Sequence, residues 1–342
     1  MTKPRIAIIG LGMAVAPHAK SLLDLAELVE VAAAYSPTEA RREAFFNAYR
    51  LPVSGDLEAI FADRTIDAVM ILTPPNTHLD LVRRAAAAGK HILLEKPLET
   101  SIDRAEAMVA AAEQQGVTLG VVLQHRFKPA SEALKALIAA DRLGSIVSAS
   151  ARIQNWRPQS YYDQPGRGTR ARDGGGVLLT QAIHILDLLI SLAGLPDEVS
   201  AYAATTPVHR METEDMVAAA LRYEGGAMGT VNATTCAFPG FPEVIEIIGA
   251  KGTAVLEGTA LTARFHDGTS VDTGKEELVG AGADPMAFPH HHHLAVLADF
   301  LYAIENGRRP RIDGREALKV HDLIEAILLS AANNRPQAVR RR

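Results

Sequence analysis

Cysteine is almost absent from this chain of 342 residues, and long apolar runs are absent too. The one cysteine, Cys236, excludes an internal disulfide and is typical of a reducing compartment. No apolar stretch has the length of a membrane-spanning helix, and two glycines interrupt the stretch near the N-terminus, where a signal peptide needs an unbroken apolar core. These absences predict a cytoplasmic protein with no membrane partner.

The chain also lacks an excess of basic charge. Its 35 Lys and Arg residues are outnumbered by 40 Asp and Glu residues, so the net charge is −5 and no nucleic-acid partner is expected. The three arginines at residues 340–342 are interpreted as a frayed tail. A length of 342 residues with 48% hydrophobic residues is enough for two domains, each with its own core.

Short apolar strands alternate with helices over the first 124 residues. Strands are expected at residues 5–9, 29–34, 66–72, 91–95 and 117–123, and helices at residues 13–28, 37–49, 77–88 and 101–115. Strands that are apolar throughout, rather than alternating, indicate a parallel sheet that helices cover on both faces. The class is therefore α/β.

The pattern changes after residue 124, where most strands follow one another without a helix between them. Strands are expected at residues 146–154, 198–204, 216–223, 228–235, 243–249, 253–256 and 261–265, and helices at residues 129–143, 177–192, 291–306 and 315–333. Consecutive strands joined by glycine-rich turns indicate a largely antiparallel sheet. We therefore predict one domain at residues 1–124 and a second at residues 125–342.

A glycine pair, Gly10 and Gly12, follows the first expected strand and opens the first expected helix. In that context glycine lets the backbone approach a pyrophosphate, whose charge then meets the helix N-terminus. Val15 stands where the usual third glycine would be, which affects the tightness of helix–strand packing rather than the phosphate site. We favour dinucleotide binding over a plain strand–helix turn.

The end of the second strand carries no carboxylate for a ribose 2′-hydroxyl before Glu39. Ser36, Thr38 and either Arg41 or Arg42 could instead accommodate a 2′-phosphate. The sequence thus favours NADP and leaves NAD open, and solvated arginines are nearly as good an interpretation.

Two further segments follow expected strands, at the edge where open α/β sheets bind ligands. The first is the turn at residues 73–78, in which Asn76 is a ligand contact, a helix N-cap or both. The second is Lys96, which ends an apolar strand and precedes Pro97, a residue that pushes Lys96 toward extended geometry. A lysine on such a rigid corner is well placed to act on a substrate.

These motifs occur in a characteristic order: the glycine pair, the turn at residues 73–78, the Glu-Lys-Pro triplet at 95–97, and three glycines at 174–176 followed by His184. In that order they resemble the Gfo/Idh/MocA family, the glucose-fructose oxidoreductase and inositol dehydrogenase group. Residues 313–317 also look like the family's C-terminal segment, so the resemblance covers nearly the whole chain.

The resemblance implies an N-terminal Rossmann domain, a doubly wound parallel sheet, and a C-terminal α+β domain with a large open, mainly antiparallel sheet, often used for oligomerisation. It also implies an NAD(P)-dependent dehydrogenase that moves a hydride between nicotinamide and a carbinol or keto carbon of a sugar, sugar derivative or cyclitol. We accordingly expect a small polyhydroxylated substrate and a homodimer or homotetramer.

Oxidation of an alcohol needs groups that manage the hydroxyl proton while hydride leaves the same carbon. Lys96 can stabilise the developing alkoxide, and His184 can take the proton near neutral pH. Thr180 lies one helical turn before His184, where the family commonly has an acid; it can hydrogen-bond a substrate hydroxyl but cannot act as a base. Asp187 is interpreted as structural rather than as the group that orients His184.

The segment before the three glycines looks like the substrate loop of the family's sugar dehydrogenases, including those acting on nucleotide-linked uronic sugars. Trp156 can stack on a sugar ring, and four nearby arginines, at 157, 167, 170 and 172, can hold a carboxylate or phosphate. An anionic or highly hydroxylated substrate is favoured over a merely solvated basic loop. The candidate substrate-binding residues are Trp156, Arg157, Tyr161, Arg170, Arg172, Gln181 and His184.

The four consecutive histidines at residues 290–293 point in different directions, so they cannot all bind one metal ion. They are interpreted as the start of a helix, with at most one histidine near the substrate, and no metal is predicted. The candidate cofactor-binding residues are Gly10, Gly12, Met13, Ala14, Ser36, Thr38, Arg41, Thr73, Pro74, Asn76, His78, Glu95, Lys96 and Gln124. Two alternative functions stay open: an oxidoreductase of dihydrodiols or other non-sugar carbonyls on the same scaffold, and a sensor that binds the nucleotide without catalysis.

Overall fold

The computed structural model describes residues 3–274 and 289–342, which form two compact units. Residues 3–124 and 289–318 make the first unit, and residues 125–274 and 319–342 make the second. Residues 289–318, which the sequence division placed in the second domain, thus belong to the first unit.

The first unit contains a six-stranded parallel sheet of strand order β3-β2-β1-β4-β5-β6, so the predicted doubly wound sheet is confirmed. Its strands are β1 (Arg5–Ile9), β2 (Glu30–Tyr35), β3 (Val53–Ser54), β4 (Ala68–Ile71), β5 (His91–Glu95) and β6 (Leu119–Val122). The strand order reverses at β1, which makes the carboxyl ends of β1 and β4 the expected place for a ligand.

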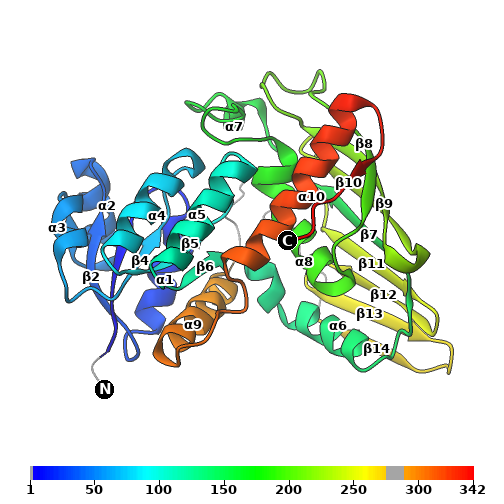
Figure 1. Cartoon of the computed structure of the whole chain (residues 1–342), viewed down its shortest axis with the longest axis horizontal. Helices are drawn as coiled ribbons and strands as arrows, with labels where there is room; N and C mark the ends of the chain where they lie inside the picture. The colour runs from blue at the N-terminus through cyan, green and yellow to red at the C-terminus, as the bar shows by residue number, and fades with distance from the viewer. Residues whose placement is uncertain (1–2, 275–288) are drawn as a thin grey trace. The chain divides into compact units, whose positions relative to one another are not determined.

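Helices cover both faces of this sheet, with α4 packed against α5 on one face and α1 against α9 on the other (Figure 1). The helices are α1 (Val15–Asp24), α2 (Glu39–Tyr49), α3 (Leu57–Ala62), α4 (His78–Ala87), α5 (Ile102–Gln114) and α9 (His291–Glu305). The short elements β3 and α3 are additional to those predicted from the sequence.

Helix α9 belongs to the first unit for two physical reasons. Phe300 is 1% exposed, and its ring lies against Gly120 of β6, where a Cβ would come within 3.0 Å of it. The backbone N–H of Val121 also donates to the carbonyl of Ile312 at 3.0 Å, so the segment after α9 adds to the edge of the sheet. The sequence shows neither contact, so residues 289–318 were predicted to lie in the same domain as the residues before them.

The described part of the second unit contains a nine-stranded sheet of order β14-β13-β12-β11-β7-β10-β9-β8-β15, in which β10 and β7 pair in parallel and the other described neighbours pair antiparallel. Its strands are β7 (Ile146–Gln154), β8 (Glu198–Ala204), β9 (Met216–Arg222), β10 (Met228–Thr234), β11 (Val244–Gly249), β12 (Gly252–Glu257), β13 (Ala260–Phe265), β14 (Ser270–Thr273) and β15 (Gln337–Ala338). The predicted, mainly antiparallel sheet is confirmed, and β14 and β15 are additional strands.

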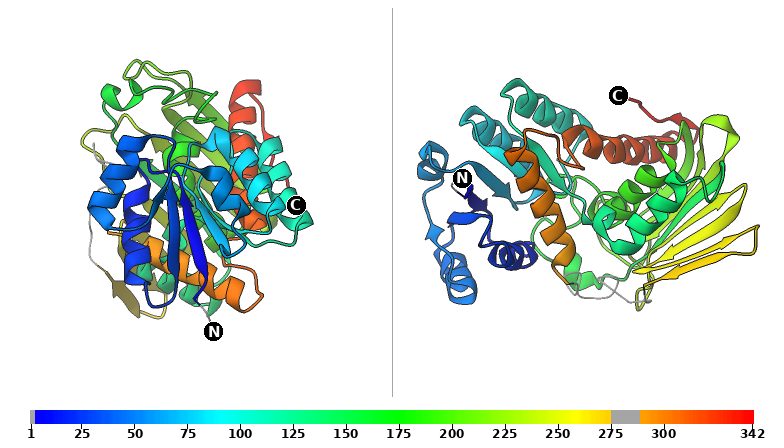
Figure 2. Two further views of the ribbon diagram at one scale, coloured as in Figure 1. Left: turned by 90° about the vertical axis from the view of Figure 1, so that its left-hand side faces the viewer. Right: turned by 90° about the horizontal axis from the view of Figure 1, so that it is seen from below.

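One face of this sheet is covered by α8 (Ile183–Ala193), which packs on β7 and β11, and by α6 (Pro129–Ala139), which packs on β12 and β13 (Figure 2). On the opposite face Tyr202 and Met228 are exposed, whereas Val217 and Val231, which point to the helices, are buried. The remaining helices are α7 (Gln159–Tyr162) and α10 (Gly314–Asn333). Among the described residues, no helix combines the length and the apolar character that crossing a membrane requires.

Replacing Phe300 by alanine should lower the free energy of unfolding by about 3–5 kcal/mol, because a fully buried ring is lost from the contact between α9 and β6. Urea unfolding at constant pH measures this change. Tyr302→Ala on the exposed side of the same helix is the matched control and should cost less than about 1 kcal/mol. Equal effects of the two substitutions would contradict the placement of α9.

Candidate functional site

The glycine turn after β1 contains one glycine that the fold requires and one that it does not. Gly10 has a φ of +108°, and a Cβ there would lie 2.9 Å from the carbonyl carbon of Leu72. A Cβ at Gly12 would meet no atom of the described residues within 4 Å. Ala14 is the N-cap of α1, and among the described residues no side chain caps this helix, so its first N–H groups suit an anion. Met13, beside them, is 45% exposed.

The turn after β2 is stabilised by local hydrogen bonds. The Oγ of Ser36, a buried residue, accepts a hydrogen bond from the backbone N–H of Thr38 at 3.2 Å. Arg42 donates to the carbonyl of Ser36 at 2.6 Å, whereas Arg41 and Thr38 are exposed. Of the two arginines that the sequence offered for a 2′-phosphate, Arg42 supports the turn and Arg41 extends from it into solvent.

The candidate residues after β4 and β6 differ in exposure. Pro74 and Asn76 are exposed, and Thr73 is half-buried, with its Oγ1 accepting from the Oγ1 of Thr77 at 2.7 Å. Asn76 does not cap α4, because no side chain of the described residues forms a cap hydrogen bond with this helix. Gln124 is 8% exposed, and its buried amide oxygen has no hydrogen-bond partner among the described residues. Such an oxygen is suited to accept a hydrogen bond from a ligand.

His78, predicted to contact the cofactor, is fully buried and connects two loops. Its Nε2 lies 2.8 Å from the carbonyl oxygen of Thr73, and its Nδ1 lies 3.1 Å and 3.0 Å from those of Pro97 and Leu98. Burial lowers the pKa of His78, although hydrogen bonds to these carbonyls oppose the shift. The ring therefore ties the turn after β4 to the corner after β5.

Glu95 and Lys96 form that corner, at the carboxyl end of β5. Glu95 is 7% exposed; its Oε1 lies 2.7 Å from the Nε2 of His18 on α1, and its Oε2 accepts a hydrogen bond from the backbone N–H of Lys96 at 3.0 Å. Burial alone raises the pKa of Glu95, but the hydrogen bond with His18 and the nearby positive charge outweigh it and hold the pKa below its usual value. An ionised carboxylate thus fixes the backbone from which Lys96 extends.

His293, from the run of four histidines, also belongs to this cluster. Its ring meets that of His18 edge to face, with centroids 5.0 Å apart. Burial lowers the pKa of His293 to about 3, so the ring is neutral at physiological pH. The side chains of His18, Glu95 and His293 have the composition of a metal site, as do those of His209, Asp215 and Cys236. The expectation of no metal therefore stays a prediction.

In the second unit, the glycines at residues 174–176 lead into a helix that begins with the π-helical turn η3 (Leu178–Ala182) and continues as α8. A Cβ at Gly176 would lie 1.8 Å from the carbonyl oxygen of Glu214, and the Glu214 carboxylate accepts from the backbone N–H groups of Gly176 and Leu178 at 3.1 and 3.2 Å. Burial raises the pKa of Glu214, against the effect of these hydrogen bonds. The predicted helix over residues 177–192 is confirmed, with residues 178–182 in π-helical rather than α-helical conformation.

Thr180 and Gln181 lie in the π-helical turn, a feature that is frequent at functional sites. The Oγ1 of Thr180 donates to the carbonyl of Gly176 at 2.7 Å and also contacts the side chain of Gln181. A threonine hydroxyl both donates and accepts, so Thr180 is able to form a hydrogen bond of either kind with a ligand hydroxyl. Gln181 is 8% exposed.

His184 follows on the first turn of α8, and its ring stacks on that of His125, with centroids 4.8 Å apart. The Nδ1 of His125 lies 3.6 Å from a carboxylate oxygen of Glu243. Asp187 forms a buried, bidentate ion pair with Arg126 at 2.7 and 2.6 Å, which agrees with its interpretation as structural. Sequence reasoning missed His125, although a polar cluster directly after a strand was a usable signal.

The predicted substrate segment runs from residue 155 to 173. Its arginines differ in their exposure and in the groups that they contact. Arg157 is 3% exposed and donates to the carbonyl of Trp156 at 2.7 Å. The guanidinium carbons of Arg157 and Arg167 lie 5.9 and 4.9 Å from the centre of the Tyr161 ring. Arg172 lies 4.0 Å from Asp173, and Arg170 is exposed.

Comparison with known proteins agrees with this architecture. Residues 4–123 match the family described as "Oxidoreductase family, NAD-binding Rossmann fold", and residues 131–255 match the "GFO/IDH/MocA C-terminal domain". A D-xylose 1-dehydrogenase (NADP(+)) of Haloferax volcanii is 30% identical over 88% of this chain and 90% of its own. An inositol 2-dehydrogenase of Rhizobium meliloti is 28% identical over 97% and 98%.

Among solved structures, the WlbA dehydrogenase of Bordetella pertussis, in complex with NADH and UDP-GlcNAcA, has a TM-score of 0.85 and 29% identity, and the alignment covers 100% of both chains. The chain belongs to the Gfo/Idh/MocA family. It is an NAD(P)-dependent oxidoreductase of that family, so the predicted class of enzyme and of cofactor is confirmed.

The low pKa of His293 predicts how stability depends on pH. Below about pH 6.5 the unfolded chain takes up a proton at this residue, whereas the folded chain does so only near pH 3, so stability falls as the pH falls between these values. From pH 7 to pH 5, the free energy of unfolding of the wild type should fall by about 2 kcal/mol more than that of His293→Gln.

Urea unfolding at the two pH values provides this measurement. His291→Gln, at an exposed histidine of the same helix, is the control and should keep the pH dependence of the wild type. An identical pH dependence in wild type and His293→Gln would rule out a buried neutral ring.

Proposed function

We propose that the protein oxidises a carbinol carbon, or reduces the matching keto carbon, of a small polyhydroxylated molecule, a sugar, sugar derivative or cyclitol. The observation that carries this proposal is the corner at the end of β5. There the ionised Glu95 holds the backbone of Lys96, next to the strands where the sheet order reverses. A fixed lysine at that edge is suited to act on a hydroxyl group rather than to serve solubility.

In the oxidative direction, the ammonium group of Lys96 donates a hydrogen bond to the substrate oxygen and stabilises its negative charge. His184 takes the hydroxyl proton, and Thr180 accepts a hydrogen bond from a neighbouring substrate hydroxyl. The nicotinamide, when bound, accepts the hydride from the carbinol carbon. The stacked ring of His125 and the Glu243 carboxylate near it keep the surroundings of His184 polar.

For the cofactor, we propose that the pyrophosphate lies against Gly12 and the uncapped N-terminus of α1. Gly12 has room for a side chain within the protein, so a close-lying ligand is the best reason for glycine there. Arg41 and Thr38 are exposed at the end of β2 and could meet a 2′-phosphate, which favours NADP over NAD. The amide oxygen of Gln124 is a further candidate contact.

For the substrate, the arginines of the segment 155–173 support an anionic or highly hydroxylated molecule. The WlbA dehydrogenase structure contains UDP-GlcNAcA, an anionic sugar derivative, whereas the curated relatives named above act on D-xylose and inositol. A panel of D-xylose, myo-inositol and a uronic acid, followed by the absorbance of the reduced cofactor, separates these classes. Cofactor binding without turnover on any polyol or keto-sugar would favour a sensor.

A homodimer or homotetramer and a cytoplasmic location are part of the same proposal. The face of the second unit's sheet that bears Tyr202 and Met228 offers an exposed surface for a second copy. The single cysteine, Cys236, is in keeping with a reducing compartment.

Lys96→Met should reduce turnover by at least about 100-fold, because it removes the charge that stabilises the alkoxide. Steady-state rates on a substrate found in the panel, together with a fluorescence titration of the reduced cofactor, provide the measurement. Lys20→Met, at an exposed residue of α1, is the control. Turnover of Lys96→Met near that of the wild type would sink the assignment of Lys96.

Gly12→Ala should leave the free energy of unfolding within about 1 kcal/mol of the wild type, yet weaken binding of NADPH and NADH by about tenfold or more. Gly10→Ala should instead destabilise the fold by about 1–3 kcal/mol, because of its positive φ and the close carbonyl of Leu72. An unchanged affinity of Gly12→Ala for NADPH and NADH would contradict the proposal that the pyrophosphate lies at this turn.

A further inference from the structure

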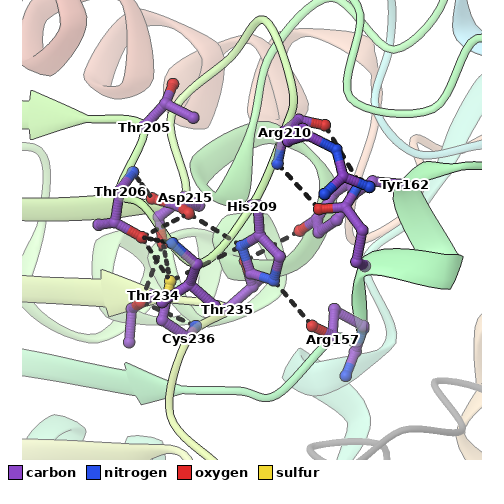
Figure 3. Close-up of polar contacts among 12 residues, drawn as sticks. Arg157, Tyr162, Thr205, Thr206, His209, Arg210, Asp215, Thr234, Thr235 and Cys236 are labelled. Atoms are coloured by element: carbon purple, nitrogen blue, oxygen red, sulfur yellow. Dashed lines mark hydrogen bonds and ion pairs between the residues drawn. The ribbon is translucent and has the colours of Figure 1, made fainter.

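A buried cluster of polar side chains contacts the candidate substrate segment at Arg157 (Figure 3). Its members His209, Asp215 and Cys236 have no role in the reaction proposed above. At its centre is His209, whose side chain is fully buried in the connection between β8 and β9. The Nε2 of His209 lies 2.8 Å from the carbonyl oxygen of Arg157, and its Nδ1 lies 2.8 Å from Oδ2 of Asp215. One imidazole thus links the backbone of a predicted substrate residue to a buried acid.

The two partners of His209 determine which atoms donate. A backbone carbonyl can only accept, so Nε2 donates to Arg157. Asp215 is ionised: burial raises its pKa, but hydrogen bonds from Thr206 and His209 outweigh burial and hold the pKa below its usual value. A carboxylate also only accepts, so Nδ1 donates as well, and the ring of His209 carries both protons.

The same side chains, with Cys236, have the composition of a metal site or of a cysteine nucleophile, but the geometry favours neither. The Nδ1–Oδ2 distance of 2.8 Å is a hydrogen bond, shorter than the roughly 3.3 Å between ligands of tetrahedral zinc with bonds of about 2.0 Å. The Sγ of Cys236 lies 3.7 Å from the same Nδ1 that serves Asp215, so His209 offers it no base, and burial raises the pKa of the thiol.

Other hydrogen bonds join the β8–β9 connection to the same segment. The backbone N–H of Arg210 donates to Oε1 of Gln159 at 2.8 Å, and that of Glu212 donates to the carbonyl of Gly168 at 3.0 Å. The carboxylate of Glu212 accepts from the backbone N–H of Arg170 at 3.1 Å. The connection therefore supports the segment at several points, and His209 is its buried, charged contact.

We propose that His209, held by Asp215, is a positioning residue that sets the backbone at Trp156 and Arg157 for substrate binding. This inference rests on the proposed function, because it takes Trp156 and Arg157 as substrate contacts. The ring of Trp156 lies 6.2 Å from that of His209, which brings the candidate sugar-stacking residue within reach of the same support. Loss of the hydrogen bond from His209 to Arg157 should therefore weaken binding of the substrate and leave binding of the cofactor unchanged.

Substitution of His209 by asparagine or by glutamine tests its two hydrogen bonds separately. In His209→Asn the amide nitrogen replaces Nδ1 and keeps the bond to Asp215, but nothing reaches the carbonyl of Arg157. In His209→Gln the amide nitrogen extends to the position of Nε2 and keeps the bond to Arg157. We expect KM for the substrate to rise about tenfold or more in His209→Asn and less than about threefold in His209→Gln, with kcat and KM for the cofactor within about threefold of the wild type in both.

The control is His266→Asn, the same substitution at an exposed histidine, which should keep all wild-type constants. Equal KM values for the substrate in His209→Asn and His209→Gln, or a matching rise in KM for the cofactor, would overturn the proposal. If the wild type turns over no alcohol in the panel, the proposed function fails instead, which is a distinct result.

A second measurement does not require the variants to fold or a substrate to be known. In protein labelled with ¹⁵N-histidine, both ring nitrogens of His209 should give the signals of protonated nitrogen at pH 7, and sequential resonance assignment of the wild type identifies these signals. A ring with one unprotonated nitrogen would contradict the arrangement in which both nitrogens donate.

Discussion

The buried carboxylate of Glu95 is the interaction on which the proposed reaction centre depends. A carboxylate is costly to bury unless charged or hydrogen-bonded partners compensate it, and here one oxygen meets His18 of α1 while the other accepts from the backbone of Lys96. This arrangement links the helix after the glycine turn to the end of β5. The backbone of the proposed catalytic lysine is thereby held to the proposed cofactor site by one side chain.

Buried histidines support the loops that carry proposed site residues in both units in a similar way. A loop at a strand end has carbonyl groups that no neighbouring strand satisfies, and these need other donors. His78 lies between the carbonyls of Thr73 and Pro97 in the first unit, and His209 meets the carbonyl of Arg157 in the second. His209 differs in that its other partner is a carboxylate, that of Asp215.

The sequence predicted the elements whose periodicity is strong and local. Both sheets, the glycine turn at Gly10 and the position of Lys96 at a strand end followed from runs of apolar residues and from turn residues. The placement of α9 in the first unit did not follow, because it depends on a tertiary contact between Phe300 and Gly120. Nor did the π-helical turn at Thr180, whose N-terminus depends on the distant Glu214.

The burial of His78 and the pairing of His209 with Asp215 were equally beyond sequence reasoning, since both need the three-dimensional positions of backbone carbonyls.

The central claim is that Lys96 acts on the hydroxyl group of the carbon from which hydride leaves. A crystal structure of the complex with NAD(P)H and a polyol that is turned over tests it most directly. We expect Nζ of Lys96 within hydrogen-bond distance of the hydroxyl on the carbon that faces nicotinamide C4; a lysine directed away from that hydroxyl would contradict the account.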